Sequence, residues 1–203
     1  MEGERTPTRE RILFATAELF RRQGYSGTGL KQIVAAAEAP FGSLYHHFPG
    51  GKGQLAEEVI HGGGAFFGAL VEAVYDAGGP ERPVGESIGA VFAGAAQTLE
   101  ATDFQDACPI ATIALEVAST DDALRRATAE VFERWTSALT ERLGERDVAL
   151  AVIAALEGAF VLCRAGRTTE PMRAAGAMAA AHVSGRLEDR SGDSAGQPGD
   201  PMA

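Results

Sequence analysis

The amino-acid sequence predicts an all-α protein of about nine helices, and three observations carry this prediction. Period-2 alternation of apolar and polar residues, which marks a half-buried strand, is rare along the chain. Apolar residues, many of them alanine, recur instead at spacings of three and four, which place them on one face of a helix. Glycine and proline residues interrupt this pattern at positions that suit helix ends.

The composition is that of a globular protein. With 203 residues, 45% of them hydrophobic and 23% charged, the chain is long enough to bury a core. Its N-terminal residues lack the apolar stretch of a secretory signal, and no run approaches the ~18 apolar residues of a membrane span. Cys108 and Cys163 form neither a CxxC pair nor a disulfide framework. We therefore expect a cytoplasmic protein with reduced cysteines.

The first helix is predicted over Thr8–Gln23. Ile12, Ala15 and Leu19 form its apolar stripe. Thr8 is the expected N-cap, and Gly24 is well placed as the C′ residue.

The next two helices are short and joined by the tight turn "EAP". The second follows a Thr28 N-cap, and the third carries Leu44 and Phe48, four residues apart on one face. The 21 residues from Thr28 to Phe48 have the length and layout of a helix-turn-helix. If Leu44 and Phe48 face the core, the opposite side of the third helix presents Gly42, Ser43, His46 and His47.

Six further helices are predicted after the "PGG" stop at residues 49–51. A cap at Ser119 or Thr120, a C′ glycine at Gly144 and a first-turn proline at Pro171 support three of their ends. The predicted ranges are 52–77, 84–101, 104–118, 121–143, 146–165 and 171–187. The terminal "RSGDSAGQPGDPMA" has the composition of a disordered tail.

The segment "TAELFRRQGYSGTGLKQIVAAAEAPFGSLYHHFPGGKGQLAEEVI" resembles the TetR family of transcriptional repressors. Within it, "GSLYHHFPGGKGQL", together with the later "CPIATIALEVA", is similar to the LmrA-like subgroup. The resemblance implies a ligand-responsive homodimer that binds a palindromic operator on double-stranded DNA. It also implies a DNA-binding domain at 1–52, a ligand-binding and dimerisation domain at 53–188, and a tail at 189–203.

Carried over residue by residue, the resemblance gives a candidate DNA-binding set. Thr28 would cap the second helix and meet a phosphate, and Lys52 would meet another. The whole set is Thr28, Lys31, Phe41, Gly42, Ser43, Tyr45, His46, His47 and Lys52. Two positions depart from the family pattern: Glu38 stands where the turn usually has glycine, and Phe41 where the subgroup commonly has lysine. Phe41 can meet a thymine methyl group, so we expect an altered sequence preference.

The charge is unevenly distributed. Residues 1–60 carry seven basic and seven acidic side chains, so the net charge of −10 falls entirely on residues 61–203. Screening over ~8 Å makes those remote charges nearly irrelevant to DNA binding. We expect the neutral N-terminal domain to use helix N-termini, hydroxyls, Lys31 and Lys52, which predicts a shallow salt dependence.

For the ligand, we expect a small apolar or aromatic inducer held by Phe66, Phe92, Phe104, Cys108, Trp135 and Phe160. Cys108 is either a core residue or part of the pocket. The glycines of "HGGGAFFGAL" (61–70) serve either close helix packing or a soft point that transmits ligand binding. Dimerisation is assigned to the last two helices, where Ala149, Val152, Ile153, Leu156, Phe160 and Cys163 keep helical spacing.

Other functions are weakly supported. The chain has no GxSxG, HExxH, Walker or dinucleotide motif, so we expect no enzyme and no cofactor. His46 and His47 point ~100° apart on a helix, which disfavours a metal site. Glu38 and Phe41 motivate one alternative, a helical dimeric interaction module that has lost specific DNA binding.

Overall fold

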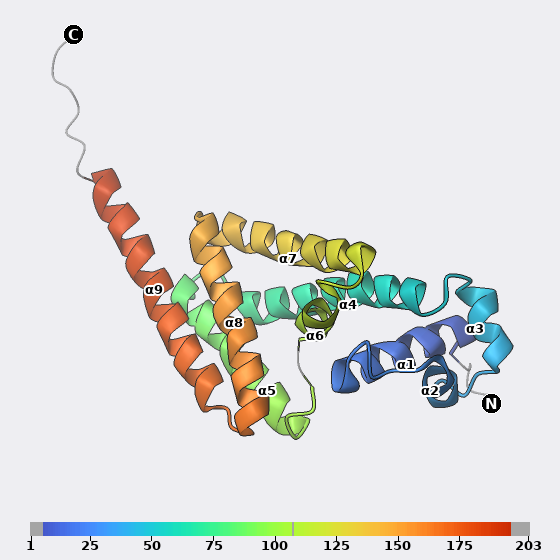
Figure 1. The fold of residues 1–203 in the computed structure, drawn as a ribbon. Helices are drawn as coiled ribbons and strands as arrows, with labels where there is room; N and C mark the ends of the chain where they lie inside the picture. The colour runs from blue at the N-terminus through green and yellow to red at the C-terminus, as the bar shows by residue number, and fades with distance from the viewer. Residues whose placement is uncertain (1–5, 107, 196–203) are drawn as a thin grey trace, which may run out of the picture.

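The computed structural model describes residues 6–106 and 108–195, with side chains to residue 187. This part of the chain forms nine α-helices and no strand, which confirms the all-α prediction (Figure 1). The helices are α1 (Thr8–Gln23), α2 (Leu30–Ala36), α3 (Phe41–His47), α4 (Gly51–Asp76), α5 (Val84–Ala101), α6 (Pro109–Val117), α7 (Asp122–Leu143), α8 (Arg146–Gly166) and α9 (Glu170–Ala195).

Two hydrophobic cores organise these helices. The smaller one lies among α1, α2 and α3, which we call the head, and includes Ile12, Ile33 and Leu44. The larger one lies among α4–α9, which we call the body, and also includes Phe20 of α1. Helix α4 runs from the head into the body (Figure 1) and contributes Leu55 to the first core and Ile60 to the second.

The predicted N-caps of the head helices are wrong. Thr8 is the first residue of α1, and the N-cap is Pro7, whose carbonyl accepts a hydrogen bond from the N–H of Arg11 at 3.0 Å. The N-cap of α2 is Gly29, not Thr28. The Thr28 hydroxyl donates to the carbonyl of Gly24 at 2.7 Å, so it closes the α1–α2 loop instead of capping a helix.

Helix α6 begins at Pro109, five residues later than predicted. Asp103 and Phe104 have positive φ angles of 50° and 57°, which no helix continues through. Cys108 precedes a proline, which also disfavours the helical conformation. Cys108 therefore becomes the N-cap of α6.

The ends of α7 follow the expected chemistry with one correction. Its N-cap is Asp121 instead of Ser119 or Thr120, because the Asp121 carboxylate accepts from the N–H of Leu124 at 3.0 Å. Gly144 has φ 78° and ends the helix in the left-handed conformation, as predicted.

Helices α5 and α9 pack closely because small residues face each other. A Cβ on Gly176 would lie 2.6 Å from the Cβ of Phe92, and one on Gly85 would lie 2.6 Å from the carbonyl oxygen of Ala180. Helix α9 continues to Ala195, into the segment 189–203 that we expected to be a tail. Residues such as Leu187 and Glu188 favour helix, and the first proline comes only at Pro198. Residues 196–203 lie outside the described part of the chain.

Helix α8 is long and apolar enough to cross a membrane by length and composition. Its side chains Val152, Leu156 and Phe160 are instead buried in the body core. A core position explains its apolar character.

Candidate DNA-binding interface and ligand cavities

Helix α3 has one buried and one exposed face. Leu44 and Phe48, the residue after the helix, are fully buried in the head core. On the other side Phe41 is 44% and Tyr45 48% exposed, and their rings meet edge to face with centroids 5.8 Å apart. A Cβ on Gly42 would meet no other atom within 4 Å, so this end of α3 is open. The helix therefore presents an aromatic pair to its surroundings.

The other predicted DNA-binding residues lie at different depths. Lys31, on α2, and His46, on α3, are exposed, whereas Ser43 and His47 are half-buried. Thr28 is buried, and its hydroxyl also accepts a hydrogen bond from the Gln23 side chain at 3.2 Å. Thr28 thus holds the loop before α2 and is not on the open face of α3.

Lys52 is the second residue of α4, close in sequence to the end of α3. Its Nζ lies 4.3 Å from the centre of the Tyr25 ring. Partial burial lowers the pKa of Lys52, and the nearby charge of Glu116 works against that shift. The ammonium group is therefore held in place by an aromatic ring before any DNA arrives.

The turn between α2 and α3 is strained at Glu38, whose φ is 48°. Arg11 of α1 supports this turn: its Nε donates to the carbonyl of Ala37 at 3.0 Å, and its Nη2 to the carbonyl of Glu38 at 3.1 Å. Sequence reasoning missed Arg11, since the contact joins residues 26 positions apart. The only feature of the sequence that could have indicated a structural role for Arg11 is its place directly before Ile12, which is buried.

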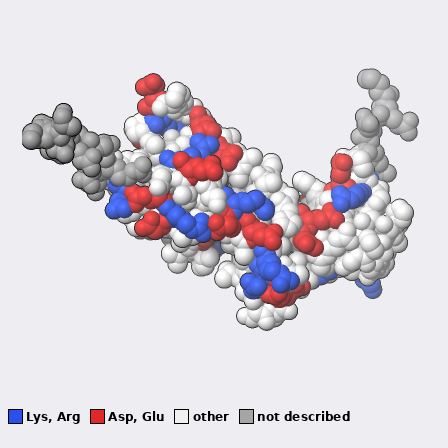
Figure 2. All heavy atoms as spheres, turned by 90° about the horizontal axis from the view of Figure 1, so that it is seen from above, with Lys and Arg blue, Asp and Glu red and all other residues white. Residues whose placement is uncertain are grey.

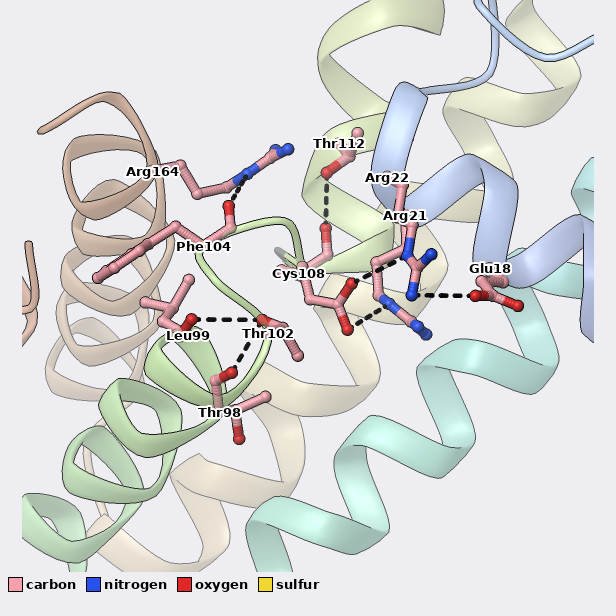
Figure 3. Close-up of polar contacts among 11 residues, drawn as sticks. Glu18, Arg21, Arg22, Thr98, Leu99, Thr102, Phe104, Cys108, Thr112 and Arg164 are labelled. Atoms are coloured by element: carbon pink, nitrogen blue, oxygen red, sulfur yellow. Dashed lines mark hydrogen bonds and ion pairs between the residues drawn. The ribbon is translucent and has the colours of Figure 1, made fainter. Parts of the chain in front are cut away.

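The arginines of α1 are engaged within the protein. Arg9 pairs with Glu58, and Arg22 pairs with Glu18 at 3.0 Å. Arg21 lies 2.9 Å from Asp106 in the segment before α6; Figure 3 shows Arg21 and Arg22 directed from α1 toward this segment. In the view of Figure 2, charged side chains of both signs intermingle along the molecule, and much of the head surface is uncharged.

The Glu116 carboxylate is one of the polar groups that join the head to the body. Glu116 of α6 accepts hydrogen bonds from the backbone N–H groups of Tyr25, at 3.0 Å, and Ser26, at 2.6 Å. These residues form the loop that leads from α1 to α2. A Cβ on Gly24, the residue before them, would collide with the Glu116 carboxylate, so the close contact requires glycine there.

The body contains a first cavity among α4, α5, α7 and α8. Its walls are mostly apolar and include the aromatic rings of Phe67, Tyr75, Phe92 and Trp135. The indole N–H of Trp135 donates to the carbonyl of Gly64 at 3.0 Å, which fixes the ring against α4.

The glycines of the 61–70 segment serve close packing at two positions. A Cβ on Gly64 would lie 2.5 Å from a methyl group of Val131, and one on Gly68 would lie 3.1 Å from the Trp135 nitrogen. Of the two explanations of this segment, the geometry supports close packing of α4 against α7.

A second cavity lies between α6 and α8 and is lined by Cys108, Phe160 and Glu116, among others. Of the predicted ligand residues, Phe92 and Trp135 line the first cavity, and Cys108 and Phe160 the second. Phe66 and Phe104 line neither.

Phe66 and Phe104 lie outside both cavities for different reasons. Phe66 is 74% exposed, and its neighbour Phe67 takes the inward position, because adjacent helical residues point ~100° apart. Phe104 lies in the loop before α6, with the guanidinium of Arg167 5.8 Å from its ring centre.

Glu157 of α8 lines both cavities, and sequence reasoning missed it. Both carboxylate oxygens are buried and find no hydrogen-bond partner of good geometry among the described residues. Burial raises the pKa of Glu157 to about 7, opposed by the nearby thiol of Cys108. Burial and the Glu157 charge raise the pKa of the Cys108 thiol well above its usual value, so Cys108 is a neutral wall residue and not a reactive thiolate.

Metal chemistry finds no support in the described ranges, 6–106 and 108–195, which contain no group of three His, Cys, Asp or Glu side chains placed to hold an ion.

The outer faces of α8 and α9 carry exposed apolar side chains: Leu150 is 46%, Val161 54%, Leu162 60% and Met178 59% exposed. The stripe that we assigned to dimerisation points the other way. Five of its six residues, Ala149, Val152, Leu156, Phe160 and Cys163, are buried in the body core of one protomer. The sixth, Ile153, is half-buried and lines the first cavity.

Comparison with protein-family models gives two separate matches. Residues 12–59 match "Bacterial regulatory proteins, tetR family", and residues 84–178 match "Transcriptional regulator LmrA/YxaF-like, C-terminal domain". The chain is 31% identical over 173 residues to the HTH-type transcriptional regulator LmrA of Bacillus subtilis, a match that covers 81% of this chain and 90% of that protein. It is 30% identical over 188 residues to the HTH-type transcriptional repressor DhaR of Mycobacterium sp., with 83% and 88% covered.

Solved structures share the fold at lower identity. The regulatory protein TetR from Rhodobacter sphaeroides superposes with a TM-score of 0.76 at 21% identity, over 86% of this chain and 98% of that one. The reduced form of E. coli NemR superposes with a TM-score of 0.71 at 22% identity, over 88% and 95%.

Proposed function

Because the chain belongs to the TetR family of bacterial regulatory proteins, we propose that it represses transcription as a homodimer on an inverted-repeat operator in the cytoplasm. It is a ligand-responsive, DNA-binding transcriptional regulator and not an enzyme. A small molecule that enters the body releases it from the DNA.

The exposed Phe41–Tyr45 pair on α3 is the observation that carries this proposal. In a helix-turn-helix the second helix enters the major groove with its N-terminal residues at the base edges. Phe41 and Gly42 stand at that end of α3, so we assign them to the bases. Tyr45, with Lys31 and Lys52, is assigned to the phosphates.

The dimer interface is assigned to the outer faces of α8 and α9. Leu150, Val161, Leu162 and Met178 supply exposed apolar area there. An isologous contact through these helices would set the two α3 helices about 34–36 Å apart, the spacing of successive major grooves. Leu162→Glu is expected to shift the protein toward monomer in sedimentation velocity, whereas Phe66→Glu, an exposed residue of α4, leaves the dimer intact.

Release of the protein from DNA requires that the ligand bind the DNA-free conformation more tightly than the DNA-competent one. A ligand that binds the DNA-competent and DNA-free conformations equally shifts nothing. Both body cavities are lined by α8. The second is also lined by α6, whose Glu116 holds the head loop, so a ligand in that cavity can change the position of the head.

The test is fluorescence anisotropy on DNA from upstream of this protein's own gene, in ~150 mM salt with competitor DNA. We expect nanomolar binding that is lost when one half-site is scrambled and that weakens at least tenfold in Tyr45→Ala. Phe14→Ala, an exposed aromatic residue of α1, is the matched control. The contrary result is binding no tighter than to scrambled DNA, followed by a selection from a random DNA pool that enriches no palindrome. In that case the protein would be a dimeric interaction module without specific DNA binding.

A further inference from the structure

The least satisfied buried group in the described residues is the carboxylate of Glu157. Its two oxygens are shielded from water, and each lacks a hydrogen-bond partner of good geometry. A buried polar group without a partner costs free energy in the empty protein, and a charged one costs more. That cost falls when a ligand brings a donor or a positive charge to it.

The charged groups around the two cavities have other partners. Arg142 of α7 is bound to both oxygens of Asp76, at 2.7 and 3.2 Å. Arg164 of α8, which lines the second cavity, donates through Nε to the carbonyl of Phe104 at 3.3 Å and forms no ion pair with Glu157, whose carboxylate oxygens have no hydrogen-bond partner of good geometry among the described residues.

The remaining titratable groups do not neutralise Glu157 either. Glu72 and Tyr75 face the first cavity from α4. Cys108 and Glu116 face the second from α6, and Glu116 is engaged with the head loop. The part of α5 that faces the first cavity is apolar. The described elements packed around Glu157 therefore supply no cation dedicated to it.

Aromatic rings surround the same space. Phe67, Phe92 and Trp135 reach the first cavity from three helices, and ring faces attract cations. The cavity holds about 80 Å³, which is room for several waters and hence for a molecule of about one ring. The geometry points to a site for a small aryl cation, an aromatic amine or amidine, whose charged nitrogen pairs with Glu157 while its ring lies among these side chains. This assignment rests on the function proposed above and names the chemical class of the effector.

Benzamidine and benzamide provide a matched pair of probes, since they have nearly the same shape and only the first is a cation. Trp135 is the one tryptophan in the chain and lies in the cavity wall, so its fluorescence reports binding, with calorimetry as a second readout. Benzamidine is expected to bind the full-length protein more tightly than benzamide by at least tenfold.

Glu157→Gln keeps the shape of the side chain and removes its charge. We expect it to weaken benzamidine binding about 10- to 100-fold, the range for a hydrogen bond to a charged group, and to change benzamide binding less than threefold. Glu72→Gln removes another carboxylate from the same cavity and is the matched control, with less than threefold effect on either probe. Unfolding curves check that each variant is folded.

The pH dependence is a second readout. A cation binds the ionised carboxylate, whose pKa in the empty protein is about 7. Benzamidine should therefore bind about tenfold more tightly at pH 8 than at pH 6, and benzamide should not. Glu157→Gln should abolish this difference.

Three outcomes would each overturn the assignment. Benzamidine and benzamide could bind equally tightly, or Glu157→Gln and Glu72→Gln could weaken benzamidine binding to the same extent. Benzamidine affinity could also remain unchanged in Glu157→Gln. These titrations contain no DNA, so they are independent of the operator experiment. A protein that binds benzamidine through Glu157 but never binds an operator refutes the proposed function and leaves the site in place. Unchanged affinity in Glu157→Gln refutes the site and leaves the DNA-binding role untouched.

Discussion

Glu38 occupies a backbone conformation that suits glycine better than any other residue. Its φ of 48° lies in the left-handed region, and Arg11 holds the turn from the other side through two carbonyls. The sequence predicted the position of this strain, because Glu38 stands where the related family usually has glycine. It did not predict Arg11, whose contact depends on how α1 crosses the turn.

Glu38→Gly is expected to stabilise the protein by about 0.5–1 kcal/mol, since it relieves the left-handed strain. The measurement is urea unfolding at fixed protomer concentration. Glu38→Ala is the control, because it removes the carboxylate and keeps the strain. If the alanine variant gained as much stability as the glycine variant, the gain would come from the side chain and not from the backbone.

Single-residue assignments in the body were harder to predict than those in the head. Helical periodicity predicts which face of a helix is buried. It does not decide whether Phe66 or Phe67 turns inward, because these two adjacent residues are flanked by glycines that do not define a buried face. Glu157 was missed for a related reason. A lone acidic residue on an apolar helix looks like a solvent-facing position, and only the packed body shows that Glu157 lines both cavities.

At the scale of helices, the predictions succeeded where the chain itself carries the signal. Gly24 and Gly144 end α1 and α7 with the positive φ angles that glycine permits. The N-caps were less predictable, since several Ser, Thr and Asp residues compete near each start. The loop before α6 was missed because Asp103 and Phe104 adopt positive φ angles although neither is glycine, the residue from which such angles are predicted.

Helix α6 is the element on which the link between body and head depends. Its Glu116 accepts the N–H groups of Tyr25 and Ser26 and also lines the second cavity. Arg21 and Asp106 form a second connection at 2.9 Å, in the segment before α6 (Figure 3 shows Arg21). A shift of α6 therefore moves the loop that leads into the helix-turn-helix.

Glu116→Ala is expected to weaken this coupling. The concentration of an effector needed for half-release from the operator should rise at least fivefold, while effector affinity measured through Trp135 changes less than twofold. Glu130→Ala, an exposed residue of α7, is the control. Equal shifts in release and in affinity would mean that Glu116 contributes to the cavity wall alone.

For the whole molecule, the net charge of −10 and the neutral head set how binding responds to salt. Three arginines of α1 pair with acidic side chains, and Arg11 is bound to the backbone carbonyls of the α2–α3 turn. Lys31 and Lys52 are therefore the cations that we assign to phosphates. Each phosphate neutralised by a cation contributes about −0.9 to the slope of log K against log salt, so two per protomer give a dimer slope of about −4.

Lys31→Ala should reduce the magnitude of that slope by about two, one for each half of the dimer, and weaken binding to all sequences alike. Operator titrations between 50 and 300 mM salt measure it. A wild-type slope near −10 would contradict the neutral-head account and require basic contacts beyond these two lysines.

The neutral net charge of the head also bears on how the protein finds its operator. Attraction to the phosphate backbone is what retains most regulators on random chromosomal sequence between encounters with their sites. We expect a head with few available cations to be held weakly there, so that the protein approaches the operator mainly from solution. Protein that is not sequestered along the genome is also open to an effector at any moment.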